Sequence, residues 1–198
     1  MSRTRVKIAA SFYGLLVVAA MVWNVVRSDD GFQIFFHPDG AWFRPQGWES
    51  VLAGTVLGIL LGQGVVWISR YTVRRFNWSR QMHIEFRSLL GPLDSLDIVA
   101  FALFSAVGEE LFFRGAMQSS LGIVISSVVF GALHVGPGRK FLPWPFFAVI
   151  VGFAFGALFW LTGNLAAPLV AHFVINYQNL HFINRYDPSH HPDVCATR

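Results

Sequence analysis

The chain has 198 residues, of which 54% are hydrophobic and 13% are charged, and its formal net charge is +4 at pH 7. An ordinary soluble domain carries about 25% charged residues, so this composition excludes a soluble globular protein. The basic residues stand beside apolar runs and form no stripe among aromatic residues, which argues against a nucleic-acid partner. We predict an all-α fold: a polytopic integral membrane helical bundle in the lipid bilayer, with no separate soluble domain.

The first two apolar runs cover residues 8–26 and 51–68. Each is long enough to cross a hydrocarbon layer about 30 Å thick as a helix. The first run follows a basic start, as in a signal peptide, but it is too long and lacks a convincing cleavage site. Between the two runs, residues 27–49 interleave Phe and Trp with Pro and Gly, which is typical of a loop at the membrane interface.

The rest of the chain begins with a basic stretch at residues 70–87, which ends at Gly91-Pro92. Asp94 or Ser95 is predicted to cap the helix that follows. Four more spans are predicted at residues 96–118, 121–135, 143–161 and 165–183, which makes about six transmembrane helices. We divide the chain into an N-terminal membrane region (1–92), a helical core (93–185) and a polar tail (186–198).

Lys and Arg are distributed unevenly between the two sides of the predicted bundle. One side receives the N-terminal cluster, the stretch at residues 70–87, Arg139, Lys140 and Arg185, and the other receives Arg27, Arg44 and Arg114. Basic residues favour the cytoplasmic side of a membrane, so we expect both termini in the cytoplasm. The compact length is typical of a prokaryotic cell-membrane protein.

Two adjacent glutamates lie late in the third predicted span. A carboxylate inside a membrane costs several kcal/mol unless it is paired, protonated or close to water. Arg114 follows Glu110 by four residues, the favourable order for an ion pair on one helix face. Glu109 is rotated about 100° away from that face and is predicted to be free for chemistry. The alternative is a buried charge cluster with a structural role only.

Three further polar residues lie in the later spans: His134 near the end of the fourth, and His172 and Asn176 on one face of the sixth. Taken alone, His134 fits a helix cap, and the other two fit ordinary polar pairing between helices. A rise of about 1.5 Å per residue, however, places all three in the same layer of the membrane as Glu109. We therefore predict one site.

Peptide hydrolysis needs an activated water, a proton donor for the leaving amine and stabilisation of the oxyanion. Glu109 with His134 is suited to activating the water, and His172 with Asn176 to stabilising the oxyanion. A zinc site formed by His134, His172 and a glutamate is the alternative. The chain lacks His-Glu-x-x-His, and Asn is a poor zinc ligand, so we favour catalysis without a cofactor and leave zinc open.

Three motifs now stand in order: Glu109-Glu110-x-x-x-Arg114, Phe130-x-x-x-His134 and His172-x-x-x-Asn176. In these motifs the chain resembles the CPBP family (CAAX protease and bacteriocin-processing, also called Abi), which includes Rce1-like prenyl-protein endopeptidases. The resemblance implies that Glu109 and His134 activate water, that His172 and Asn176 form the oxyanion hole, and that Glu110 and Arg114 support them. It further implies an intramembrane endopeptidase whose partner is a membrane-anchored protein or peptide, cleaved near its C-terminus.

Two other classes remain as alternatives. The chain could be a non-catalytic membrane protein, an immunity factor or scaffold that keeps the polar layer for structure or peptide binding. Buried Glu and His residues also suit a proton-coupled transporter. The chain shows no internal repeat that would indicate a transporter built from two inverted halves.

Overall fold

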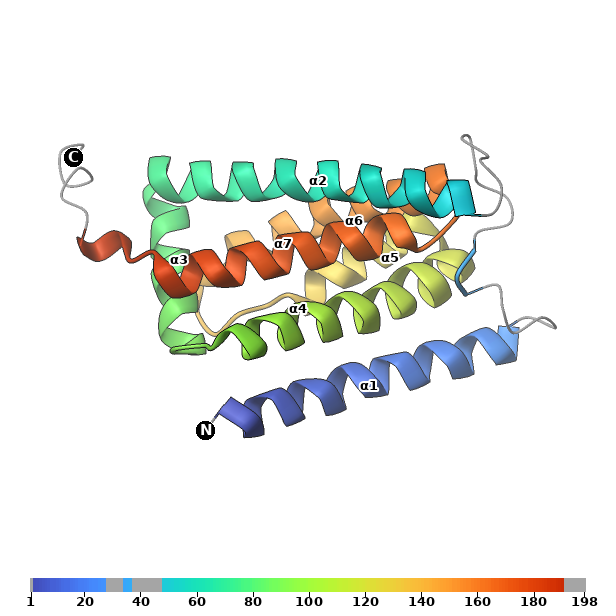
Figure 1. The fold of residues 1–198 in the computed structure, drawn as a ribbon, viewed down its shortest axis with the longest axis horizontal. Coiled ribbons are helices and arrows are strands. Elements are labelled where there is room, and N and C mark those ends of the chain that lie inside the picture. Colours follow the sequence, from blue (N-terminus) through green and yellow to red (C-terminus); the bar gives the residue numbers. More distant parts are fainter. Residues whose placement is uncertain (1, 28–33, 37–47, 191–198) are drawn as a thin grey trace.

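The computed structural model describes residues 2–27, 34–36 and 48–190. Its long helices run roughly side by side, except α3, which lies across one end (Figure 1). The all-α prediction is confirmed. The α-helices are α1 (Ser2–Arg27), α2 (Trp48–Arg75), α3 (Asn77–Leu90), α4 (Ser95–Glu110), α5 (Ser119–Leu133), α6 (Pro143–Thr162) and α7 (Ala166–Arg185). A π-helix (Leu111–Gln118) joins α4 to α5, and 3-10 helices cover Arg139–Phe141 and Pro188–His190.

Four helical stretches are long and apolar enough to cross a membrane: Thr4–Arg27, Trp48–Arg75, Ser95–Leu133 and Arg139–Thr162. The third stretch contains two predicted spans, because the chain reverses at Gly122, where φ is +83°. The reversal brings the Ser126 hydroxyl to the carbonyl of Phe113, to which it donates at 2.7 Å. The sixth predicted span matches α7. This helix is not one of the four apolar stretches, because it carries several polar side chains. The chain is a multi-pass membrane protein.

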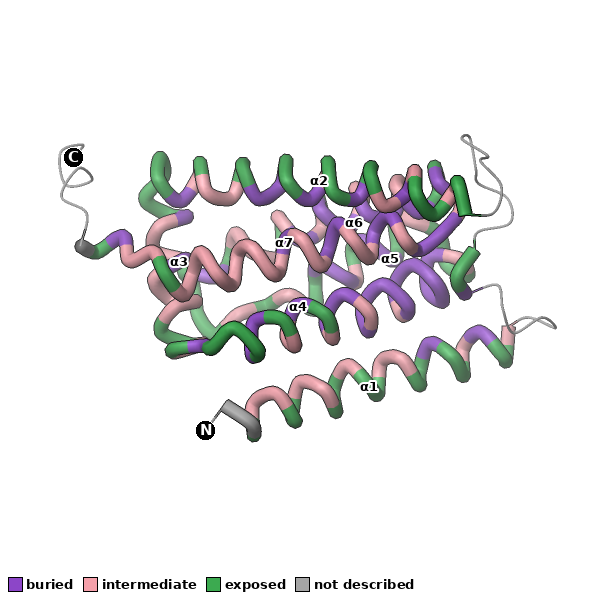
Figure 2. Tube along the Cα trace, viewed as in Figure 1, coloured by how far each residue is buried: buried purple, intermediate pink, exposed green. Residues whose placement is uncertain are grey.

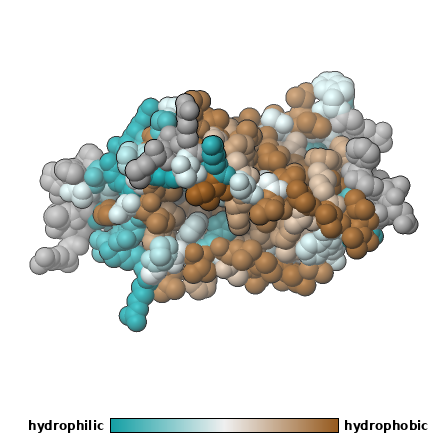
Figure 3. Space-filling view, turned by 90° about the horizontal axis from the view of Figure 1, so that it is seen from below, coloured by the Kyte–Doolittle hydropathy of each residue, from teal (hydrophilic) through white to brown (hydrophobic). Residues whose placement is uncertain are grey.

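Helix α3 was not predicted. Figure 3 shows hydrophobic side chains over much of one face of the molecule and hydrophilic ones gathered toward the end where α3 lies. Arg87 of α3 donates hydrogen bonds to the carbonyls of Ile183 (2.8 Å) and Asn184 (2.6 Å). These carbonyls belong to the last turn of α7, where a helix leaves its acceptors without internal partners. Helix α3 therefore closes the end of α7. Most of the loop predicted at residues 27–49, including Arg44, lies outside the described residues.

A row of small residues on α2 forms the surface against which α7 packs. Glycines recur at every fourth position of α2, and all three are buried against α7: Gly54, Gly58 and Gly62. A Cβ atom added at Gly62 would lie 2.9 Å from the Cβ of Val174, closer than van der Waals contact allows. Such small-xxx-small rows let membrane helices approach backbone to backbone. The depth and rotation of α7, and thus of His172 and Asn176, depend on this row.

Helix α4 begins with the predicted cap. The Asp94 side chain accepts from the Asp97 backbone N–H at 2.8 Å, and the Asp97 carboxylate accepts from the Asp94 N–H, which makes a full capping box. Helix α1 packs along α4, while α2 packs along α7 and α5 along α6. Figure 2 shows that burial is densest where α4 continues into the π-helix, and that α1 and α2 expose their outer faces. The polar layer thus lies in the best-packed part of the bundle.

His83 of α3 makes the stability of the fold sensitive to pH. Its Nε2 donates to the Tyr186 carbonyl at 2.9 Å, and burial lowers the pKa of His83 below its ordinary value of 6.5. The unfolded chain therefore takes up a proton more readily, and stability present above about pH 6.5 is lost as the pH falls. We expect the melting temperature of the wild type to fall more steeply below this pH than that of His83→Gln. An equal fall of the melting temperature with pH in the two proteins would contradict this expectation.

Candidate active site

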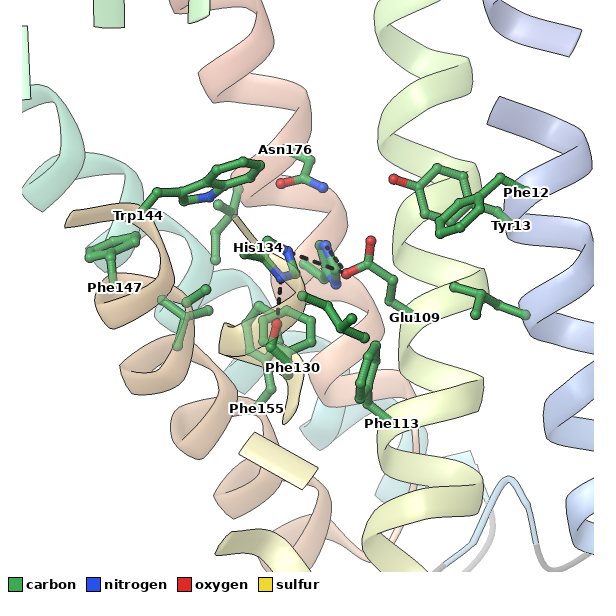
Figure 4. A pocket seen from close by; sticks show the side chains of 16 residues that line it. Phe12, Tyr13, Glu109, Phe113, Phe130, His134, Trp144, Phe147, Phe155 and Asn176 are labelled. Atoms are coloured by element: carbon green, nitrogen blue, oxygen red, sulfur yellow. Dashed lines mark hydrogen bonds and ion pairs between the residues drawn. The ribbon is translucent and has the colours of Figure 1, made fainter. Parts of the chain in front are cut away.

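A cavity of about 320 Å³ lies among α1, α4, α5, α6 and α7 (Figure 4). Its walls are largely aromatic and aliphatic, with contributions from Phe12, Phe113, Phe130, Trp144 and Phe155. Few polar side chains line it, and they come from four different helices: Tyr13, Glu109, His134, His172 and Asn176. An apolar pocket with a few converging polar groups is the usual form of a binding or catalytic site. The structure thus brings together the four residues predicted to be catalytic.

Glu109 lies at the centre of the polar groups. Its Oε2 atom is 3.7 Å from Nε2 of His134 and 3.9 Å from Nε2 of His172. Both distances exceed that of a direct hydrogen bond. The same oxygen is buried and has no hydrogen-bond partner. One carboxylate oxygen is therefore held between two imidazoles at a spacing that leaves it available to a small polar molecule.

The contacts of Nδ1 in the two histidines determine which ring nitrogen carries a hydrogen. Nδ1 of His134 lies 2.6 Å from the Phe130 carbonyl, which can only accept, so this nitrogen carries the hydrogen. Nδ1 of His172 lies 2.7 Å from Oε1 of Glu110 and donates to that carboxylate. In the neutral form, each ring therefore turns the lone pair of Nε2 toward Glu109. In the protonated form, His172 presents an N–H there instead.

Glu110 and Arg114 form a buried cluster behind His172. Nη1 of Arg114 donates to Oε1 of Glu110 at 3.0 Å, and the two side chains are 1% and 0% exposed. Nη2 of Arg114 donates to the Gly152 carbonyl at 3.1 Å, and the guanidinium lies 4.4 Å from the centroid of the Phe130 ring. Since Oε1 of Glu110 also accepts from His172, one carboxylate links α4 to α7. The predicted pair is present, and the link to His172 was not predicted.

Asn176 is oriented by a residue that the sequence did not single out. Its Nδ2 donates to Oγ of Ser105 at 2.8 Å, and the Ser105 hydroxyl donates to the Ala102 carbonyl at 3.3 Å. Ser105 is buried one helical turn before Glu109 on α4. The same nitrogen carries a second hydrogen, and Asn176 lines the cavity. The only sequence signal for Ser105 was its position four residues before Glu109, on the same face of the helix.

Part of the chain is similar to known proteins. Residues 91–178 match the family model described as type II CAAX prenyl endopeptidase Rce1-like. This part of the chain is therefore similar to Rce1-like proteins. An uncharacterized Bacillus subtilis (strain 168) protein, YpbD, is 36% identical over 81 residues, which cover 40% of this chain and 41% of that relative. The match thus spans about two fifths of the relative's length. No solved structure matches significantly.

The matched region contains all six residues of the predicted site, from Glu109 to Asn176. It does not contain α1, although Phe12, Tyr13 and Leu16 of that helix line the cavity. The cavity is therefore completed by a helix from outside the matched region. Sequence reasoning gave no role to this helix beyond crossing the membrane.

The zinc alternative was considered on the same residues. Within residues 2–27, 34–36 and 48–190, no group of three or more His, Cys, Asp or Glu side chains is arranged to hold a metal ion. Zinc binds its ligand atoms at about 2.0–2.2 Å in tetrahedral geometry. The described side chains therefore form no such ligand set, and no step below is assigned to a metal.

Proposed function

We propose that this protein is an intramembrane endopeptidase of the glutamic type, which hydrolyses a peptide bond in a membrane-anchored protein or peptide. The observation that carries the proposal is the unpartnered Oε2 of Glu109, held 3.7 and 3.9 Å from two imidazole nitrogens. A water between Oε2 of Glu109 and either nitrogen would be within hydrogen-bond reach of both atoms. The match to the Rce1-like family supports the class of reaction.

The proposed reaction begins with this water. Glu109 takes its proton while Nε2 of His134 accepts its second hydrogen, so that the oxygen attacks the carbonyl carbon of the scissile bond. The carboxylate of Glu110 accepts a hydrogen bond from Nδ1 of His172 at 2.7 Å and fixes the orientation of that ring. His172 and the free amide hydrogen of Asn176 then donate to the oxyanion. Glu109 returns its proton to the leaving nitrogen as the C–N bond breaks.

The walls of the cavity suit a hydrophobic peptide segment. Aromatic and aliphatic side chains on both sides of Glu109 would contact such a segment in extended form, including Phe12, Leu16, Phe147 and Val151. Cleavage near the C-terminus of the substrate follows from the family resemblance alone. We place the protein in the cell membrane with its ends in the cytoplasm, because basic residues gather at the end that holds α3 and the C-terminus of α7.

The proposal is tested with purified protein in lipid vesicles and a panel of single-span peptides, with mass spectrometry to detect the products. We expect cleavage within or beside the apolar segment, and we expect it to survive removal of metal by a strong chelator. Loss of cleavage on chelation, with recovery on adding zinc, would overturn the glutamic-type assignment. The reconstituted protein without chelator is the control.

A further inference from the structure

Helix α1 brings a phenol to the site from outside the matched region. Tyr13 is partly buried and lines the cavity, and its hydroxyl points toward the Glu109 carboxylate (Figure 4). The roles proposed above for water activation and oxyanion stabilisation do not involve this residue. A phenol is a hydrogen-bond donor to a carboxylate even in an apolar cavity.

The position of Tyr13 is fixed by its own backbone. Helices α1 and α4 touch at Gly108, directly before Glu109, where an added Cβ atom would lie 3.0 Å from both Cβ and O of Tyr13. A side chain at position 108 would require the two helices to move apart by a few tenths of an ångström. The residue before the proposed base and the residue bearing the phenol are therefore in backbone contact, which holds the two side chains at a constant separation.

Both ends of α1 are also tied to the bundle. Near the N-terminus, Arg5 donates a hydrogen bond to the Leu90 carbonyl at the end of α3. At the C-terminus, Arg27 donates to the Ser120 hydroxyl at 3.1 Å. Helix α1 otherwise exposes most of its surface, including Phe12, Leu15 and Val18. A helix that buries so little yet is held at both ends and at Gly108 is suited to positioning Tyr13.

From this geometry we propose that Tyr13 is a positioning residue of the active site, whose hydroxyl donates a hydrogen bond to Glu109 and keeps the carboxylate turned toward His134 and His172. The effect on turnover rests on the proposed function, but the hydrogen bond itself does not. The titratable and charged groups around Glu109 come from α1, α5, α7 and the π-helix junction: Tyr13, His134, His172, Glu110 and Arg114. Among them, Tyr13 alone presents a hydrogen to Glu109 when both imidazoles are neutral.

The test compares Tyr13→Phe with a matched control, Tyr71→Phe, on the exposed face of α2. Dicyclohexylcarbodiimide modifies protonated carboxyl groups at apolar sites, and mass spectrometry of peptides gives the modified fraction of Glu109 across a pH series. A hydrogen bond from Tyr13 would stabilise the charged form of the Glu109 carboxylate. We therefore expect the midpoint of labelling to move to higher pH by about one unit in Tyr13→Phe and to stay unchanged in Tyr71→Phe.

In the peptide-cleavage assay, kcat of Tyr13→Phe should fall about tenfold while KM changes little. Equal labelling midpoints in Tyr13→Phe and the wild type would overturn the proposal, as would unchanged turnover when Glu109→Gln is inactive. Retained turnover in Glu109→Gln would instead refute the proposed function. The labelling comparison would still decide whether Tyr13 holds Glu109, because it needs no substrate.

Discussion

Replacing Glu109 with Gln is expected to abolish peptide cleavage and leave the fold intact. The amide keeps the size of the side chain but can neither take a proton from water nor return one to the leaving amine. General acid and base catalysis by one side chain contributes about 10²–10⁴-fold, so turnover should fall by at least that factor. The measurement is the rate of product formation in lipid vesicles, with the melting temperature recorded for the same samples.

The matched control for this substitution is Glu85→Gln. Glu85 lies on α3, is partly exposed and pairs with Lys140 at a distance of 2.6 Å, and it does not line the cavity. The Glu85→Gln variant should retain full turnover. If Glu109→Gln cleaved as fast as the wild type, Glu109 would not be the base. A different outcome would favour a non-catalytic membrane protein. In that case, neither the wild type nor the two variants would cleave any peptide, and cells carrying Glu109→Gln would keep the wild-type phenotype.

Arg114→Met is expected to destabilise the protein by about 3–5 kcal/mol, because it leaves the Glu110 carboxylate buried without its cation. The guanidinium is 1% exposed and also donates to the Gly152 carbonyl at 3.1 Å, so α6 loses a contact as well. The free energy of unfolding is measured in detergent, with Arg75→Met as the control. Arg75 is exposed at the end of α2, and its replacement should change stability little.

The double variant Glu110→Gln/Arg114→Met separates lost charge pairing from lost packing. Removing both charges takes away the uncompensated carboxylate, so the double variant should be more stable than Arg114→Met alone. A double variant less stable than either single variant would show that Glu110 and Arg114 contribute independently. Such a result would contradict the buried cluster as the source of stability.

Local geometry could be predicted from the sequence, because one helix fixes its own spacing. The Asp94 cap and the ion pair between Glu110 and Arg114 both follow from three- and four-residue separations. The contact between Glu110 and His172 joins residues 62 positions apart, and no helical period connects them. It depends on how deeply α7 sits against α2 and α4. That depth is set by packing of small residues, which a polar motif does not encode.

Other features were missed because their signals were weak. The π-helix after Glu110 has the same apolar composition as an α-helix, so its wider turn left no mark in the hydropathy pattern. Tyr13 is an ordinary residue for a membrane helix, and Ser105 is one of several serines in the spans. Helix α3 was interpreted only as a source of positive charge, although its charged and apolar residues alternate with a helical period.

The glycine row of α2 has a consequence for how this protein can vary. The residues at positions 54, 58 and 62 must stay small for α7 to keep its position. The residues on the outward face of α2 need only be apolar enough to face lipid. A helix specified by one small residue per turn tolerates replacement at most other positions. Relatives can therefore diverge along the outward face of α2 and still hold the groups of the candidate site at one depth. A substitution as mild as Gly58→Ala should matter more than any exchange on the opposite face.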